Sequence, residues 1–125
     1  MMNPSSFLRL AIVAIGVSTI VSACGSDSSP TAPTPSPAAD VTVTIQGNNG
    51  SNSYAPSPVS MRVGQTIAWR NADSITHTAT QDVGGFNTGT VAAGATSALT
   101  MMNTAGSFTY HCTIHPGMVG TINVQ

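Results

Sequence analysis

The 125-residue sequence has no lysine and no glutamate, and charged residues make up only 6% of it. Its basic side chains are three arginines and its acidic side chains are four aspartates, so the formal net charge is −1 with histidine neutral. A chain with so few cations offers no basic patch, and we expect no nucleic-acid partner. Because charges of both signs are so few, we also expect no strong electrostatic steering of a protein partner.

Cysteine is also scarce, because the chain has only Cys24 and Cys112. Cys24 follows Arg9 and an apolar run over residues 10–21, an arrangement typical of an export signal whose apolar run is shorter than a membrane span. The letters "VSAC" at its end resemble a lipoprotein signal, in which cleavage precedes a cysteine that is then lipidated. We therefore predict a lipoprotein-type signal peptide at 1–23 and lipid attachment at Cys24. An ordinary signal peptide or a single membrane-spanning helix would be a competing interpretation of the same residues.

The segment that follows Cys24 lacks large apolar residues. Residues 24–39 consist mainly of Ser, Thr, Pro and Ala, so we predict a flexible tether. The folded unit is then a single domain over residues 40–125, which the signal would place on the periplasmic or cell-surface side of a bacterial membrane. A lipid anchor would hold it at that membrane.

No stretch of residues 40–125 shows a helical period. Short runs of alternating apolar and polar residues recur instead, as in "VTVTI", "VSMRV", "TIAWR", "SFTYH" and "VGTINV", and Gly, Pro, Asn and Asp separate them. Short strands with a turn signal about every ten residues predict an all-β domain, an antiparallel sandwich or barrel.

The alternation also predicts which side chains face the core. In "VSMRV", Val59 and Val63 share one face with the methionine between them. In "SFTYHC", Tyr110 and Cys112 share one face, whereas His111 points to the other. We therefore expect Cys112 to be buried and His111 not to be a metal ligand.

Three metal-binding side chains stand three residues apart near the C-terminus: Cys112, His115 and Met118. A Pro-Gly pair before Met118 permits a tight turn that would return the thioether to the same point. His77 is the remaining histidine that could complete the set. Two imidazoles, a thiolate and a weak axial thioether are the ligands of blue copper. A metal would also protect a lone thiol that an exported protein exposes to oxidation.

Residues 41–125 also resemble a known family, the small cupredoxins of the plastocyanin, amicyanin and azurin group. The resemblance is carried by "YAPSPVSMRVGQTIAWRN", "FNTGTVAAGATSALTMM" and "GSFTYHCTIHPGMVGTINV". It implies a Greek-key antiparallel β-sandwich and one copper ion that cycles between Cu(I) and Cu(II). It further implies that His77, Cys112 and His115 are the strong ligands, that Met118 is the long axial ligand, and that the edge of His115 is the electron port.

The sequence departs from that family at two positions beside the ligands. Thr78 stands where the family often has an asparagine that braces the cysteine loop. Ile114 stands where many relatives have proline, so its N–H is free to donate to the sulfur of Cys112 and raise the reduction potential.

These features favour a one-electron carrier that is a monomer and exchanges electrons with redox protein partners. A second hypothesis is an enzyme, a copper oxidase or a protein like nitrite reductase. It would need a second copper centre, for which only His111 remains. Two further hypotheses are a copper-handling lipoprotein without electron transfer and a sandwich that binds no metal.

Overall fold

The computed structural model describes residues 36–125. The predicted signal peptide, Cys24 and the tether up to residue 35 lie outside the described residues. Residues 36–39 form neither strand nor helix before the first strand begins. Within this described range, no helix has the length and apolar character needed to cross a membrane.

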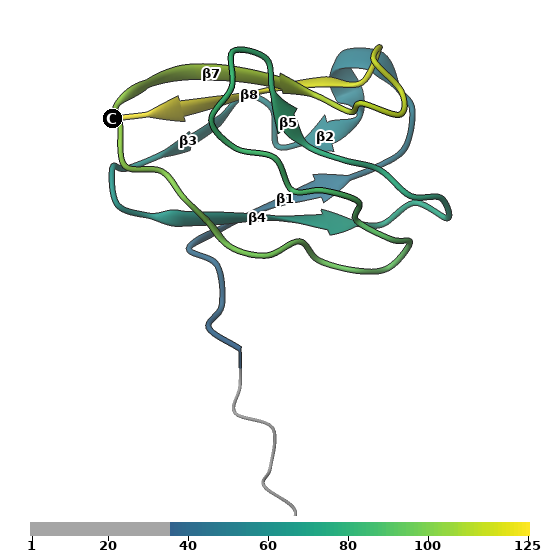
Figure 1. Cartoon of the computed structure of the whole chain (residues 1–125), viewed down its shortest axis with the longest axis horizontal. Helices are drawn as coiled ribbons and strands as arrows, with labels where there is room; N and C mark the ends of the chain where they lie inside the picture. The colour runs from purple at the N-terminus through teal and green to yellow at the C-terminus, as the bar shows by residue number, and fades with distance from the viewer. Residues whose placement is uncertain (1–35) are drawn as a thin grey trace, which may run out of the picture. The chain divides into compact units, whose positions relative to one another are not determined.

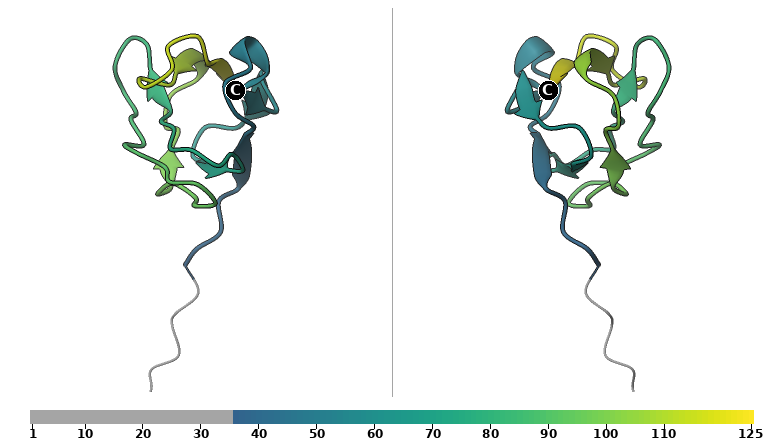
Figure 2. Two further views of the ribbon diagram at one scale, coloured as in Figure 1. Left: turned by 90° about the vertical axis from the view of Figure 1, so that its right-hand side faces the viewer. Right: turned by 90° about the vertical axis from the view of Figure 1, so that its left-hand side faces the viewer.

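Two four-stranded sheets make up the domain (Figure 1). One sheet has the order β2-β1-β4-β6, formed by Tyr54–Ala55, Val41–Ile45, Thr66–Asn71 and Thr100–Met101. The other has the order β3-β8-β7-β5, formed by Val59–Met61, Val119–Val124, Gly106–His111 and Thr80–Gln81. A short 3-10 turn, η1, covers Gly50–Asn52. Figure 2, turned by 90°, shows the sheets on either side of a space that the core side chains fill.

The predicted all-β sandwich is confirmed, with one correction to its description as antiparallel. The pairings β1–β4 and β3–β8 are parallel, whereas β1–β2, β4–β6, β5–β7 and β7–β8 are antiparallel. Alternation along one strand predicts which face is buried but carries no information on the direction of its neighbour. Both parallel pairs join strands that are separate in sequence, so no hairpin turn could indicate them.

The core lies between the sheets and is centred on aromatic rings. Trp69 of β4 is fully buried and stacks on Phe86 with ring centroids 5.1 Å apart. Tyr110 of β7 is also fully buried and meets Trp69 edge-on at 5.6 Å. Gly120 lies opposite Tyr110 on β8, and a Cβ at this glycine would overlap the tyrosine ring. The glycine therefore leaves the space that the ring occupies.

Strand alternation predicted the buried face of β7 correctly and failed at one position near β3. Tyr110 and Cys112 are fully buried, as expected. Val63 was expected on the buried face with Val59 but is 49% exposed. The reason is that β3 ends at Met61 and the chain then turns, so the alternation of the strand no longer applies at Val63.

The strand directions place two loops at the same end of the sandwich. β4 and β7 both run toward that end, and the loops that follow them lie there together (Figure 1). β5 pairs antiparallel with β7, with Thr80 opposite His111. Continued by two residues, this register brings Thr78 next to Thr113 and thus beside Cys112.

Candidate metal centre

The C-terminal loop begins directly after β7 and closes on itself. Cys112 follows the last residue of β7, and its side chain is fully buried. Its N–H donates to the carbonyl of Met118 at 3.1 Å, and the N–H of Met118 donates to the carbonyl of His115 at 2.9 Å. These bonds hold all three predicted ligand positions in one tight loop. The side chain of Met118 is fully buried, whereas His115 is partly exposed.

His77 lies between β4 and β5 and is fixed by its backbone. It exchanges two backbone hydrogen bonds with Val91, of 3.1 and 2.8 Å, and its side chain is fully buried. The loop before it is held by Asn71, the last residue of β4. The buried amide of Asn71 donates to the carbonyls of Ile75 and Val91 at 2.7 and 2.9 Å, and its oxygen accepts the N–H of Asp73 at 2.9 Å.

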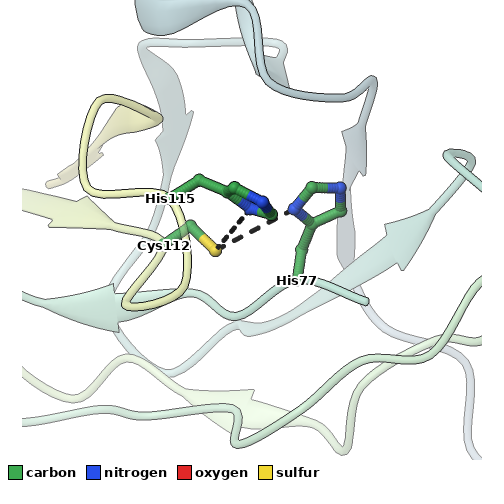
Figure 3. Close-up of side chains that lie close together, drawn as sticks. All are labelled: His77, Cys112 and His115. Carbon is green, nitrogen blue, oxygen red and sulfur yellow. Dashed lines mark hydrogen bonds between the residues drawn. The ribbon is translucent and has the colours of Figure 1, made fainter. Parts of the chain in front are cut away.

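Three candidate ligand atoms converge at one point (Figure 3). The Sγ of Cys112 is 3.9 Å from Nδ1 of His77 and 3.9 Å from Nδ1 of His115. All three atoms lie within 4.8 Å of one another. At zinc sites the ion lies roughly 2.0–2.3 Å from a thiolate sulfur or an imidazole nitrogen, so a sulfur and a nitrogen that bind the same ion are less than about 4.4 Å apart. Both sulfur–nitrogen distances therefore fit a single small ion held by the thiolate and an imidazole.

The surroundings of Cys112 favour its thiolate, the form that binds metals. Burial alone raises the pKa of the thiol. The hydrogen bond from the Thr78 amide, and the contacts of the sulfur with the His77 ring and with the amide and ring of His115, outweigh that effect and bring the pKa to about 6. The site thus favours a deprotonated sulfur before any cation binds.

Thr78 connects the two loops through its N–H and its hydroxyl, and its carbonyl adds a bond to β2. Its N–H donates to Sγ of Cys112 at 3.3 Å. Its Oγ1 accepts the N–H of Thr113 at 2.8 Å and lies 3.1 Å from Oγ1 of that residue. Its carbonyl accepts the hydroxyl of Tyr54 at 2.5 Å. A threonine hydroxyl therefore reaches the cysteine loop at a position where the family often has asparagine.

The amide donor to the sulfur differs from the one expected from the sequence. We expected the N–H of Ile114 to donate to Cys112, but it is the N–H of Thr78 that donates to this sulfur, at 3.3 Å. The β5–β7 register explains this donor, because it aligns the Thr78 segment with the start of the cysteine loop. The side chain of Ile114 is 48% exposed beside the site.

Sequence reasoning missed Asp73. Its Oδ2 lies 2.8 Å from Nε2 of His77, the ring nitrogen that faces away from Cys112. The hydrogen bond with His77, followed by that from the Ser74 amide, lowers the pKa of this carboxyl from its ordinary value. The available signal was an acidic residue four positions before a candidate ligand, but that spacing suggests contact only in a helix. Here a loop brings the two side chains together.

His111 lies outside the converging group, as the alternation of β7 predicted. Its side chain is 32% exposed, and its Nδ1 is 2.6 Å from Oδ1 of Asp82. The described residues contain three histidines, and their side chains thus divide into two that meet at Cys112 and one that pairs with a surface carboxylate.

Comparisons with known proteins agree with this geometry. The model of the family described as copper binding proteins, plastocyanin/azurin family, matches residues 41–125. A plastocyanin of Scenedesmus fuscus is 32% identical over 98 residues, which cover 69% of this chain and 100% of the plastocyanin.

Two solved structures extend the comparison. A purple cupredoxin from Nitrosopumilus maritimus superposes with a TM-score of 0.61 and 27% identity, covering 69% of this chain and 100% of that chain. A copper-containing nitrite reductase from Thermus scotoductus matches with a TM-score of 0.60 and 30% identity over 72% of this chain but 23% of its own. The protein belongs to the plastocyanin/azurin family of copper-binding proteins, and copper is its cofactor.

Proposed function

We propose that this protein is a type 1 copper protein that carries single electrons between redox partners outside the cytoplasm. The observation that supports this most strongly is the convergence of one thiolate and two imidazoles at the buried end of the sandwich. His77, Cys112 and His115 would hold the copper ion, and Met118 would be its weak axial ligand. When bound, copper supplies the exchange between Cu(I) and Cu(II), for which this ligand set is suited.

The chain's own residues would keep the site rigid and largely dry. His77 and Cys112 are fully buried, and the hydrogen bonds of Thr78 tie their loops together. A site that is fixed in this way rearranges little when the charge of its ion changes. Little rearrangement favours fast electron exchange over chemistry on a bound substrate.

The partly exposed His115 is the proposed electron port. Beside it in the same loop the chain presents Ile114 and Pro116, both exposed, and residues 112–119 contain no charged side chain. An uncharged loop of this kind fits brief docking with weak dependence on salt. The redox partners would therefore meet an apolar surface at this end of the domain.

An enzyme is disfavoured by the number of metal-binding side chains. The sequence has three histidines, and the third, His111, pairs with Asp82 and does not form part of a second metal site. The chain also spans 23% of the nitrite reductase that it resembles. We propose that the domain acts as a carrier and not as a catalyst.

We also propose that the protein is exported and anchored through lipid on Cys24. The basis is the sequence alone: an apolar run that ends at a cysteine, followed by a Ser/Thr/Pro/Ala-rich tether. The tether would let the domain reach partners near the membrane. Wild-type protein is expected in the membrane fraction, and Cys24→Ala is expected to leave that fraction or to remain unprocessed. Equal lipidation and membrane association of both forms would contradict this.

The electron-carrier role can be separated from copper storage by electron self-exchange. NMR line broadening in mixtures of oxidised and reduced protein measures this rate. Ile114→Asp places a charge at the proposed port and is expected to slow exchange on the order of tenfold, the equivalent of about 1.4 kcal/mol. Val63→Asp, at the opposite end beside Gln125, is the matched control and should change it little. Slow exchange in the wild-type protein would favour copper handling without electron transfer.

A further inference from the structure

Asp73 is the one carboxylate that contacts a candidate copper ligand among the described residues. His77 is fully buried, and the Asp73 side chain is 25% exposed, so the carboxylate lies between the buried ring and solvent. The contact joins Oδ2 to Nε2 at 2.8 Å, while Nδ1 of the same ring faces Cys112. The two nitrogens of one imidazole thus have two distinct partners.

A carboxylate accepts hydrogen bonds and cannot donate them. A 2.8 Å contact with Nε2 therefore requires a proton on that nitrogen. In the neutral ring the other nitrogen, Nδ1, is then free of hydrogen and presents its lone pair toward Cys112. Metal binding needs this form, because a protonated nitrogen has no lone pair to offer.

The surrounding loop holds Asp73 in place for this contact. Oδ1 accepts the N–H of Ser74 at 2.7 Å, so both carboxylate oxygens are in use. The N–H of Asp73 donates to the buried Asn71. Gly47 lies against the carboxylate, with φ of +108°, and a Cβ there would come to 3.2 Å from Oδ2. The fold therefore leaves room for Asp73 and fixes its direction.

We propose that Asp73 is a positioning residue for the copper site, which holds the proton of His77 on Nε2, presents Nδ1 to the metal and places one negative charge behind the ligand. This rests on the proposed function, since it takes His77 as a copper ligand. A partner of this kind behind a metal-binding histidine raises the basicity of the ring and supports metal affinity. Its charge also favours the more positive copper state, so it lowers the reduction potential.

The first test needs no copper. In metal-free, ¹⁵N-labelled protein, the ring nitrogen shifts of His77 report which nitrogen carries the proton. We expect the Nε2–H form in the wild type and in Asp73→Asn, whose side-chain oxygen can still accept. Asp73→Ala should give a mixture of the two forms. Unchanged ring shifts in Asp73→Ala would overturn the proposal.

The second test measures the copper affinity and the reduction potential of the copper-loaded protein. A residue with a purely structural role would not change both quantities in the pattern described next. Asp73→Ala should weaken copper binding by about 10–100-fold in competition with a chelator. Asp73→Asn keeps the shape and the acceptor but loses the charge, so it should retain most of the affinity and raise the reduction potential. Asp82→Asn, which removes the same charge from the His111 pair, is the matched control and should change neither quantity.

The outcomes distinguish this proposal from the function on which it rests. A wild-type protein without an intense copper–thiolate absorption band would refute both. An intact band with equal copper affinity in Asp73→Ala and the wild type would refute the role of Asp73 alone. A rise in potential in Asp82→Asn as large as that in Asp73→Asn would show a general charge effect and would also refute it.

Discussion

Residues 36–125 contain two histidine–aspartate pairs of nearly equal length, and burial makes them different. Nε2 of His77 is 2.8 Å from Asp73, and Nδ1 of His111 is 2.6 Å from Asp82. His77 is fully buried, whereas His111 is 32% exposed and its partner is 40% exposed. Solvent screens the second pair, and exposed pairs of this kind contribute little to stability.

The contrast between the pairs teaches that distance alone does not identify a functional pair. His77 has a second buried contact, with Cys112, so its carboxylate partner determines how the ring meets the metal site. His111 adjoins Cys112 in sequence but lies on the other face of β7 and connects that strand to the segment after β5. The two pairs should therefore respond very differently to equivalent substitutions.

The largest contrast is expected when each histidine is removed. His77→Ala deletes one of the strong ligands and should abolish the intense visible absorption of the copper-loaded protein. His111→Ala deletes a ring outside the site and should leave that absorption in place. Loss of the band in His111→Ala, in protein that remains folded by circular dichroism, would break the distinction between the pairs.

The next effect concerns the support of the buried pair. Asn71→Ala removes an amide that bonds two carbonyls and the Asp73 N–H. Leaving such buried groups without partners should lower the free energy of unfolding by about 1–3 kcal/mol. Denaturant titration of the metal-free protein measures this. Asn87→Ala, an exposed asparagine that bonds Gly89 and Thr80, is the control and should cost about 0.5 kcal/mol or less.

A smaller loss is expected at the residue after His77. Thr78→Ala removes the hydroxyl that accepts the N–H of Thr113 and should cost about 1 kcal/mol in unfolding free energy. Thr78→Ser keeps the hydroxyl oxygen and should retain most of the unfolding free energy that Thr78→Ala loses. If Thr78→Ser and Thr78→Ala lower the unfolding free energy equally, the lost methyl group and not the hydrogen bond accounts for the change.

The smallest effect belongs to the exposed pair. Hydrogen bonds with the side chains of Thr109 and His111 lower the pKa of Asp82 below its ordinary value of 3.8. Because the folded pKa is the lower one, its contribution is present above the unfolded pKa and is lost as pH falls through the folded value. Asp82→Asn should therefore differ from the wild type above about pH 4 by about 0.5 kcal/mol or less, and converge with it in acid. A constant difference across this range would exclude a role for ionisation.

The features of the site that the sequence predicts are local. Cys112, His115 and Met118 lie within one short loop, so their spacing alone indicates convergence. The inward direction of Cys112 and the outward direction of His111 follow from strand alternation. His77 could be named because the chain has so few histidines.

The remaining features depend on contacts that spacing does not determine. The Thr78 amide reaches Cys112 through the β5–β7 register, which joins segments more than thirty residues apart. The contact between Asp73 and His77 depends on a loop conformation fixed by Asn71. The parallel pairing of β1 with β4 likewise depends on the packing of whole sheets.

The most direct test of the central claim is the visible absorption of copper-loaded protein measured beside Cys112→Ser. We predict an intense band from the copper–thiolate bond in the wild type, and its absence in the variant, because serine offers no thiolate. Thermal unfolding of both metal-free proteins controls for folding. A colourless wild-type protein, or a weak band that survives in Cys112→Ser, would contradict a copper site built on Cys112 and the electron-carrier function that rests on it.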